Sequence, residues 1–168
     1  MADTVLVHPN RDKAEAKATK AIVVLLLLAS AALILVVTIG GWSELQGAQV
    51  ISFALAAIYI GMAVVVSRWN RGVLPVAAGM AILFSVIAAV AGPAWFDRDK
   101  NGYDNPGLPP EMLGLLTLLI VPVQFLLIVF AMRGFNQEWN VEVEVSRDEY
   151  DRQGGGSGDF RDYEPEPA

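Results

Sequence analysis

The chain has 168 residues, of which 54% are hydrophobic and only 18% are charged, whereas about a quarter is charged in an ordinary soluble domain. This composition predicts an integral membrane protein whose first partner is the lipid bilayer. Cysteine is absent, which excludes disulfides, thiolate metal sites and cysteine nucleophiles. The formal net charge is −6, so we expect no basic surface and no nucleic-acid partner.

Four apolar segments predict four membrane spans. Residues 21–40 contain no charged residue, and a helix of that length is about 30 Å long, enough to cross the hydrocarbon core. The remaining segments are residues 49–66, 73–92 and 112–132. Each must be helical, because hydrocarbon offers unpaired backbone groups nothing to bond with. The predicted fold class is therefore all-α, with a four-span transmembrane helix bundle over residues 21–132.

A secretory signal peptide is the alternative interpretation of the first segment. Lys17 and Lys20 precede the apolar run, and Ala29-Ser30-Ala31 resembles a cleavage site for signal peptidase. However, the apolar sequence continues to Ile39, which is longer than the apolar region of a signal peptide normally is. We therefore expect an uncleaved anchor.

The positions of lysine and arginine predict the orientation, because short cytoplasmic loops are enriched in both. The N-terminal arm, residues 1–20, carries four of them, the 67–72 loop carries two, and Arg133 follows the last span. The 41–48 loop has none and the long 93–111 loop has two. We expect both termini in the cytoplasm and the long loop outside. Many Ala, Val and Gly residues with few lysines favour a bacterial plasma (inner) membrane.

Small residues at four-residue spacing predict how the spans pack, because helices in lipid associate where their backbones approach closely. The third and second spans carry such residues at Ala77, Ala81, Ser85 and Ala89, and at Ala57 and Gly61. Alanine-rich helices also produce this pattern by chance. We expect the second and third spans to pack along this stripe. The first span lacks one of such length, so we expect it to face lipid.

The fourth span has a proline and an amide near its middle. Pro122 removes one helical hydrogen bond and favours a kink, and Gln124 places an amide near the bilayer midplane. One interpretation is a structural hydrogen bond from Gln124 to Tyr59 or Ser85 on another span. The other is a substrate or gate contact in a small homo-oligomeric transporter or pore.

The loop after the third span resembles the first half of a calcium-binding loop. Asp97, Asp99 and Asn101 occupy positions 1, 3 and 5, and a glycine follows, as in an EF-hand. Position 12 is Leu108, which cannot supply the bidentate carboxylate. Asp, Asn, Gly and Pro residues also form ordinary turns, so a turn without an ion is the alternative. Calcium is the only cofactor that the sequence indicates.

The same loop contains aromatic residues beside its charges. Trp95, Phe96 and Tyr103 form a mixture typical of a protein interface. The four tryptophans lie at or beyond the ends of spans, as anchors at the membrane surface do.

The chain beyond the fourth span divides into two parts. In the juxtamembrane segment, residues 133–153, valine alternates with glutamate over residues 141–145, which predicts one short strand. Residues 154–168 form a Gly/Ser linker and an acidic tail that we expect to be disordered. Either part offers a site for a cytoplasmic partner protein, through strand pairing or through the tail. A solvated tail without a partner is the alternative.

His8, the only histidine, is expected to be a surface residue.

The spans contain no ionisable side chain other than Tyr59, whereas membrane enzymes and ion carriers usually keep charged groups along their pathways. We therefore expect a non-catalytic accessory or scaffolding subunit associated with other membrane-protein subunits. The alternatives are the transporter or pore that uses Gln124 and Pro122, and a calcium-responsive sensor that uses the outer loop.

Overall fold

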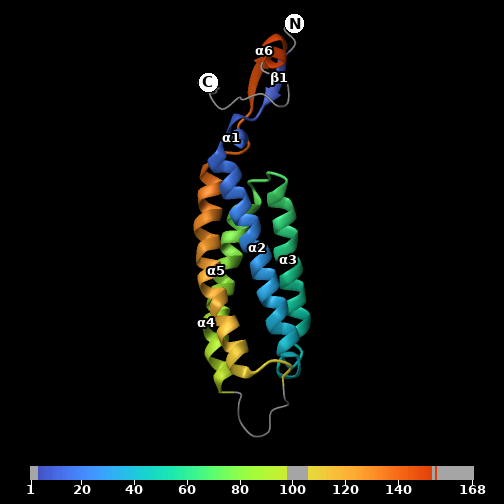
Figure 1. The fold of residues 1–168 in the computed structure, drawn as a ribbon, viewed down its shortest axis with the longest axis vertical. Coiled ribbons are helices and arrows are strands. Elements are labelled where there is room, and N and C mark those ends of the chain that lie inside the picture. Colours follow the sequence, from blue (N-terminus) through green and yellow to red (C-terminus); the bar gives the residue numbers. More distant parts are fainter. Residues whose placement is uncertain (1–3, 98–105, 153, 155–168) are drawn as a thin grey trace.

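The structure is a computed structural model that describes residues 4–97, 106–152 and 154. The elements in chain order are β1 (Thr4–Val7), α1 (Pro9–Asp12), α2 (Ala14–Gly40), the 3-10 helix η1 (Trp42–Glu44), α3 (Gln49–Ser67), α4 (Val73–Phe96), α5 (Pro110–Asn136), β2 (Val143–Ser146) and α6 (Arg147–Arg152). The long helices α2, α3, α4 and α5 form an elongated bundle, and β1, β2 and α6 project from one end of it (Figure 1).

The four long helices are each long and apolar enough to cross a membrane, as the sequence predicts. The chain is a multi-pass membrane protein. All four helices extend beyond the predicted spans: α2 starts at Ala14, α3 ends at Ser67, α4 ends at Phe96, and α5 runs from Pro110 to Asn136. Prolines do not interrupt them: α4 continues past Pro93, and α5 passes through Pro122. The loop that was expected to start at residue 93 therefore starts about one helical turn later, after Phe96.

The helices do not pack as the stripe of small residues predicted. The main contacts are α4 against α5 and α2 against both α3 and α5, while α3 and α4 make few contacts with each other. Ala77 and Ala81 are buried, but Ser85 is only half-buried, and the remaining stripe residues are exposed: Ala89, Ala57 and Gly61. Residues four apart advance by about 40° around a helix of 3.6 residues per turn. The stripe therefore rotates away from the buried face of α4 between Ala77 and Ala89.

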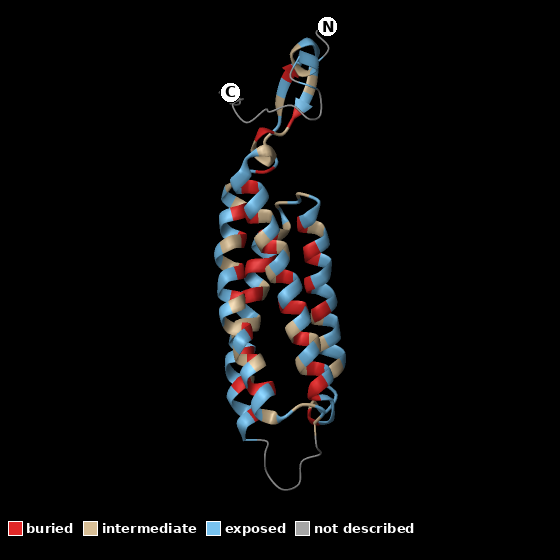
Figure 2. Ribbon diagram, in the orientation of Figure 1, coloured by how far each residue is buried: buried red, intermediate tan, exposed pale blue. Residues whose placement is uncertain are grey.

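The prediction that the first span faces lipid was also wrong. α2 lies between α3 and α5 and contacts both, and its apolar stretch has the largest buried share of the four spans, 39%. Figure 2 shows the buried residues on the inward faces of the bundle and the exposed residues on its outward faces. Leucine and isoleucine suit both a lipid-facing surface and the interior of a helix bundle, so their abundance in α2 could not show which of the two environments α2 occupies.

The fold contains a small sheet and is therefore not purely α-helical. β1 and β2 pair antiparallel, with Val5 opposite Val145 and Val7 opposite Val143. The alternating valines and glutamates predicted a strand after the fourth span, and the structure has one there. Its partner is the chain's own N-terminal arm, whose sequence did not indicate a strand.

Candidate functional site

A buried cluster of polar side chains joins three helices in the middle of the bundle. Gln124 on α5 accepts a hydrogen bond at Oε1 from the Tyr59 hydroxyl on α3, at 2.9 Å. Its Nε2 donates to the Ser30 hydroxyl on α2, also at 2.9 Å. Ser30 in turn donates to the carbonyl of Leu26, at 2.7 Å. We call Ser30, Tyr59 and Gln124 the polar node.

The polar node uses both ends of the Gln124 amide. Gln124, Tyr59 and Ser30 are each 0% exposed, so the node is closed to a passing solute in this conformation. Ser85, the other partner considered for Gln124, donates to the Ile82 carbonyl within its own helix instead. The arrangement is that of interhelical hydrogen bonding in a membrane bundle.

The second candidate site lies outside the bundle, where the two ends of the described chain meet. β1, β2 and α6 form a unit that we call the terminal ribbon. Val7 and Val145 are buried within it, and Val143 and Tyr150 pack against them. On the other face, Leu6 lies opposite Glu144 and is 56% exposed. The ribbon thus has a small apolar core and one open face.

Side chains from the N-terminal arm connect the terminal ribbon to the end of α5. Asn10 Nδ2 donates to the carbonyl of Glu138 at 3.1 Å, and Arg11 Nε donates to the carbonyl of Trp139 at 2.8 Å. His8 Nε2 lies 3.2 Å from a carboxylate oxygen of Glu142. His8 is therefore not simply a solvated surface residue, since it contacts the segment that leads into β2.

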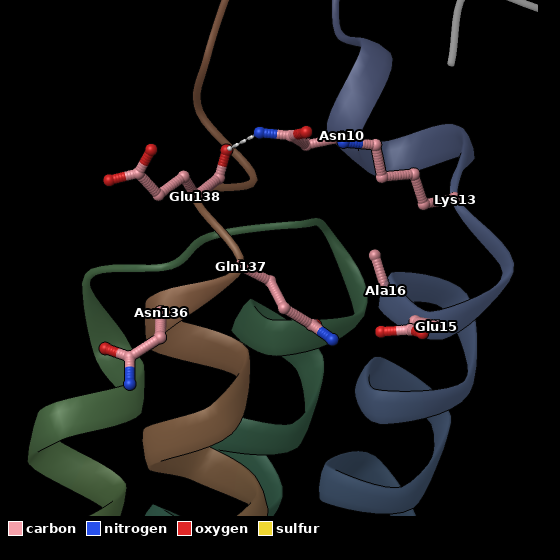
Figure 3. Close-up of a pocket in the computed structure, with 7 residues that line it drawn as sticks. All are labelled: Asn10, Lys13, Glu15, Ala16, Asn136, Gln137 and Glu138. Atoms are coloured by element: carbon pink, nitrogen blue, oxygen red, sulfur yellow. Dashed lines mark hydrogen bonds between the residues drawn. The ribbon is translucent and has the colours of Figure 1, made fainter. Parts of the chain in front are cut away.

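A polar pocket of about 270 Å³ lies below these contacts. Figure 3 shows its residues, which come from the N-terminal arm, the start of α2 and the end of α5: Asn10, Lys13, Glu15, Ala16, Asn136, Gln137 and Glu138. Gln137 Nε2 donates to the Thr19 hydroxyl at 3.1 Å, and Trp139 Nε1 donates to Gln137 Oε1 at 3.1 Å. These bonds join α2 to the exit of α5.

The tryptophans divide into two pairs rather than four equal surface anchors. Trp42 is exposed and Trp69 half-buried, whereas Trp95 and Trp139 are 3% and 0% exposed. Trp69 meets Trp139 edge-on, with ring centroids 5.4 Å apart, and Lys20 lies 3.8 Å from the centre of the Trp69 ring. Trp139 is therefore a core residue of the ribbon end of the bundle.

The outer-loop site is only partly within the described residues. Asp97 caps the end of α4, while Asp99, Asn101 and Tyr103 lie outside the described residues. Across the part of the chain that is described, no three acidic or histidine side chains form a group that could hold a metal ion. Of the interface residues, Phe96 is 42% exposed but Trp95 is buried. Trp95 therefore belongs to the bundle rather than to an exposed aromatic surface.

Comparisons of the chain with protein-family models, curated proteins and solved structures found no match.

Two features of the candidate sites were not predicted from the sequence. Ser30 was not predicted as a partner of Gln124, although its place in the middle of a span was a signal for interhelical bonding. Residues 4–7 form a strand of only four residues, too short for a period of two to stand out.

Proposed function

We propose that the protein is a non-catalytic accessory or scaffolding subunit of a larger membrane complex. It resides in the plasma (inner) membrane with both termini in the cytoplasm, and it binds a partner protein through the terminal ribbon. The orientation rests on the lysine and arginine residues of the N-terminal arm and the 67–72 loop.

The observation that carries this proposal is the terminal ribbon. Within the described residues each of its strands has a single neighbour, so each has an edge at which another strand can add. Natural proteins usually protect such edges. Here the exposed Leu6 lies beside them on the open face, which suits a surface that a partner covers.

The contacts of the N-terminal arm support a docking role, because they limit the freedom of the ribbon relative to the bundle. A partner that binds a held ribbon loses less conformational entropy than one that binds a free tail. Asn10 and Arg11 supply two of these contacts through backbone carbonyls of residues 138 and 139.

The polar node favours this function over the transporter or pore. A pathway residue needs polar atoms that are available to the solute, and the amide of Gln124 already bonds Tyr59 and Ser30. Pro122 lies within a continuous helix. Both residues therefore have a structural explanation as parts of the packed bundle.

The test is extraction of the full chain from its own host into native nanodiscs, followed by intact-complex mass spectrometry. We expect a stoichiometric complex with larger, unrelated subunits. Leu6→Asp places a charge on the open face of the ribbon and should release the partner. Arg152→Gln, on α6, changes the net charge by the same amount and should retain it.

Two outcomes would contradict the proposal. A pure homo-oligomer or monomer in the wild-type sample would favour the pore interpretation or a solitary role. Equal partner retention in Leu6→Asp and wild type would remove the ribbon as the docking surface. Circular dichroism and thermal unfolding of both variants check that the helix bundle remains intact.

A further inference from the structure

An apolar cavity of about 280 Å³ lies in the half of the bundle away from the terminal ribbon. All four long helices contribute to its walls, together with Leu45 and Ala48 of the α2–α3 connection. Ile51 on α3 and Ile87 on α4 line it and are also exposed. Because α3 and α4 make few contacts with each other, the cavity opens between them, toward the surrounding lipid.

The hydroxyl groups on the cavity wall are already hydrogen-bonded. Thr38 donates to the Ile34 carbonyl at 2.7 Å, and Thr117 donates to the Leu113 carbonyl at the same distance. Ser52 donates to the Ala48 carbonyl at 3.1 Å. Each side chain thus satisfies its donor within its own helix. The hydroxyl oxygens keep acceptor lone pairs, but most of the lining side chains are aliphatic or aromatic, so the cavity favours an apolar occupant.

The size and direction of the cavity select among apolar occupants. A transmembrane helix is about 10 Å across, whereas an acyl chain is a single file of methylene groups, so a cavity of about 280 Å³ suits a segment of one acyl chain better than a helix. The cavity runs from the loop residue Leu45 inward to Phe84, whose ring meets Tyr59 of the polar node at 6.0 Å. It therefore follows the direction of a lipid chain, from the membrane surface toward the midplane.

We propose that this cavity binds one acyl chain of a bilayer phospholipid from the leaflet opposite the terminal ribbon. Lipid tails are as apolar as the cavity wall, so burial from water does not hold the chain. The driving force is dispersion, because an empty cavity leaves its lining atoms without contacts on one side. The bound lipid fills the gap between α3 and α4 and completes the packing of the bundle.

Trp95 provides a direct readout of the occupant. It lines the cavity and is 3% exposed, so lipid around the protein reaches it poorly. The full chain carrying Trp42→Phe, which removes the exposed tryptophan, is reconstituted in nanodiscs of phosphatidylcholine with bromine on its acyl chains. The contribution of Trp95 to the fluorescence is the difference between this protein and a matched variant that also carries Trp95→Phe. We expect bromine to quench that contribution. Absence of that quenching would overturn the proposal.

Cavity-filling variants test the position of the chain. Ala91→Leu, from α4, and Ala48→Leu, from the connection just before α3, add bulk to opposite walls and should each abolish the Trp95 quenching. Ala89→Leu makes the same change on the exposed face of α4 and should leave it unchanged. Two results would contradict the proposal: quenching that survives in both filled variants, or a dimer whose partner copy covers the cavity. If one of the two cavity-filling variants does not fold, the quenching measured in the other still decides the test.

Discussion

At the scale of single residues, the polar node determines how three helices meet. The node places a tyrosine hydroxyl, an amide and a serine hydroxyl where neither water nor lipid can bond to them. A buried polar group without a partner costs about 1–3 kcal/mol. Each member is therefore tolerated because the other two are in place, and the helices are held in one register.

Replacement of Gln124 should destabilise the bundle. Gln124→Leu leaves the Tyr59 hydroxyl without its acceptor, and we expect a loss of about 1–2 kcal/mol in the free energy of unfolding. Tyr59→Phe removes the same bond from the other side. The double variant should lose less than the sum of the two single variants, as measured by reversible unfolding in mixed micelles.

The control for this cycle is Ser85→Ala, because Ser85 bonds only within its own helix. Its effect should stay within about 0.5 kcal/mol. Strictly additive effects of the Gln124 and Tyr59 substitutions would mean that the two side chains are not coupled. In that event Gln124 would again be available as a pathway residue.

The sequence could predict part of this node. An amide in the middle of a span must find a partner, and Tyr59 was one of two candidates. Ser30 was not among them, because the choice depends on which faces of the helices meet. That depends on the rotation of each helix, which apolar composition does not encode when lipid and protein interior are equally apolar.

At the scale of elements, glycine rather than alanine sets the closest helix approach. A Cβ atom on Gly92 would lie 2.6 Å from Leu118 Cδ2, and one on Gly114 would lie 3.2 Å from the Gly92 carbonyl oxygen. Both glycines lie where α4 packs against α5. Gly61, in the predicted stripe, has no described atom within 4 Å of such a Cβ, so its small size serves no contact with the described part of the chain.

Alanine substitution can separate these environments. Gly92→Ala and Gly79→Ala occur in the same helix and gain similar helix propensity, but only Gly92 faces α5, since no described atom lies within 4 Å of a Cβ on Gly79. We expect Gly92→Ala to be less stable than Gly79→Ala by about 1–3 kcal/mol, because Leu118 must move. Thermal unfolding in one detergent measures the difference, and equal stabilities would contradict the close α4–α5 contact.

The four spans could be predicted from the sequence because length and apolarity alone define a transmembrane helix. Their ends were less certain. Prolines are tolerated in membrane helices, so Pro93 did not end α4, and polar residues continued α2 and α5 beyond the apolar core. The pairs of helices that pack together could not be predicted, because the spacing of small residues in one helix does not indicate which other helix contacts it.

At the scale of the whole molecule, the terminal ribbon brings the two ends of the described chain together. An even number of spans places both ends on one side of the membrane, and the pairing of β1 with β2 requires it. The sequence indicated the strand in the glutamate-rich segment but not its partner. Pairing between segments this far apart depends on the bundle that holds their ends near each other.

Engineered cysteines can test this pairing in the intact membrane, because the chain has no cysteine of its own. Leu6 and Glu144 lie directly opposite each other, where Cβ atoms of an antiparallel pair are about 4.5–5.5 Å apart. Leu6→Cys with Glu144→Cys should therefore form a disulfide under mild oxidation, seen as a mobility shift on a non-reducing gel. Leu6→Cys with Ser146→Cys, a diagonal pair in the same register about 7–8 Å apart, should oxidise poorly, because disulfides rarely bridge such distances. Equal oxidation of both pairs would indicate a ribbon without fixed register, and no oxidation of either would indicate that the two ends of the chain do not pair.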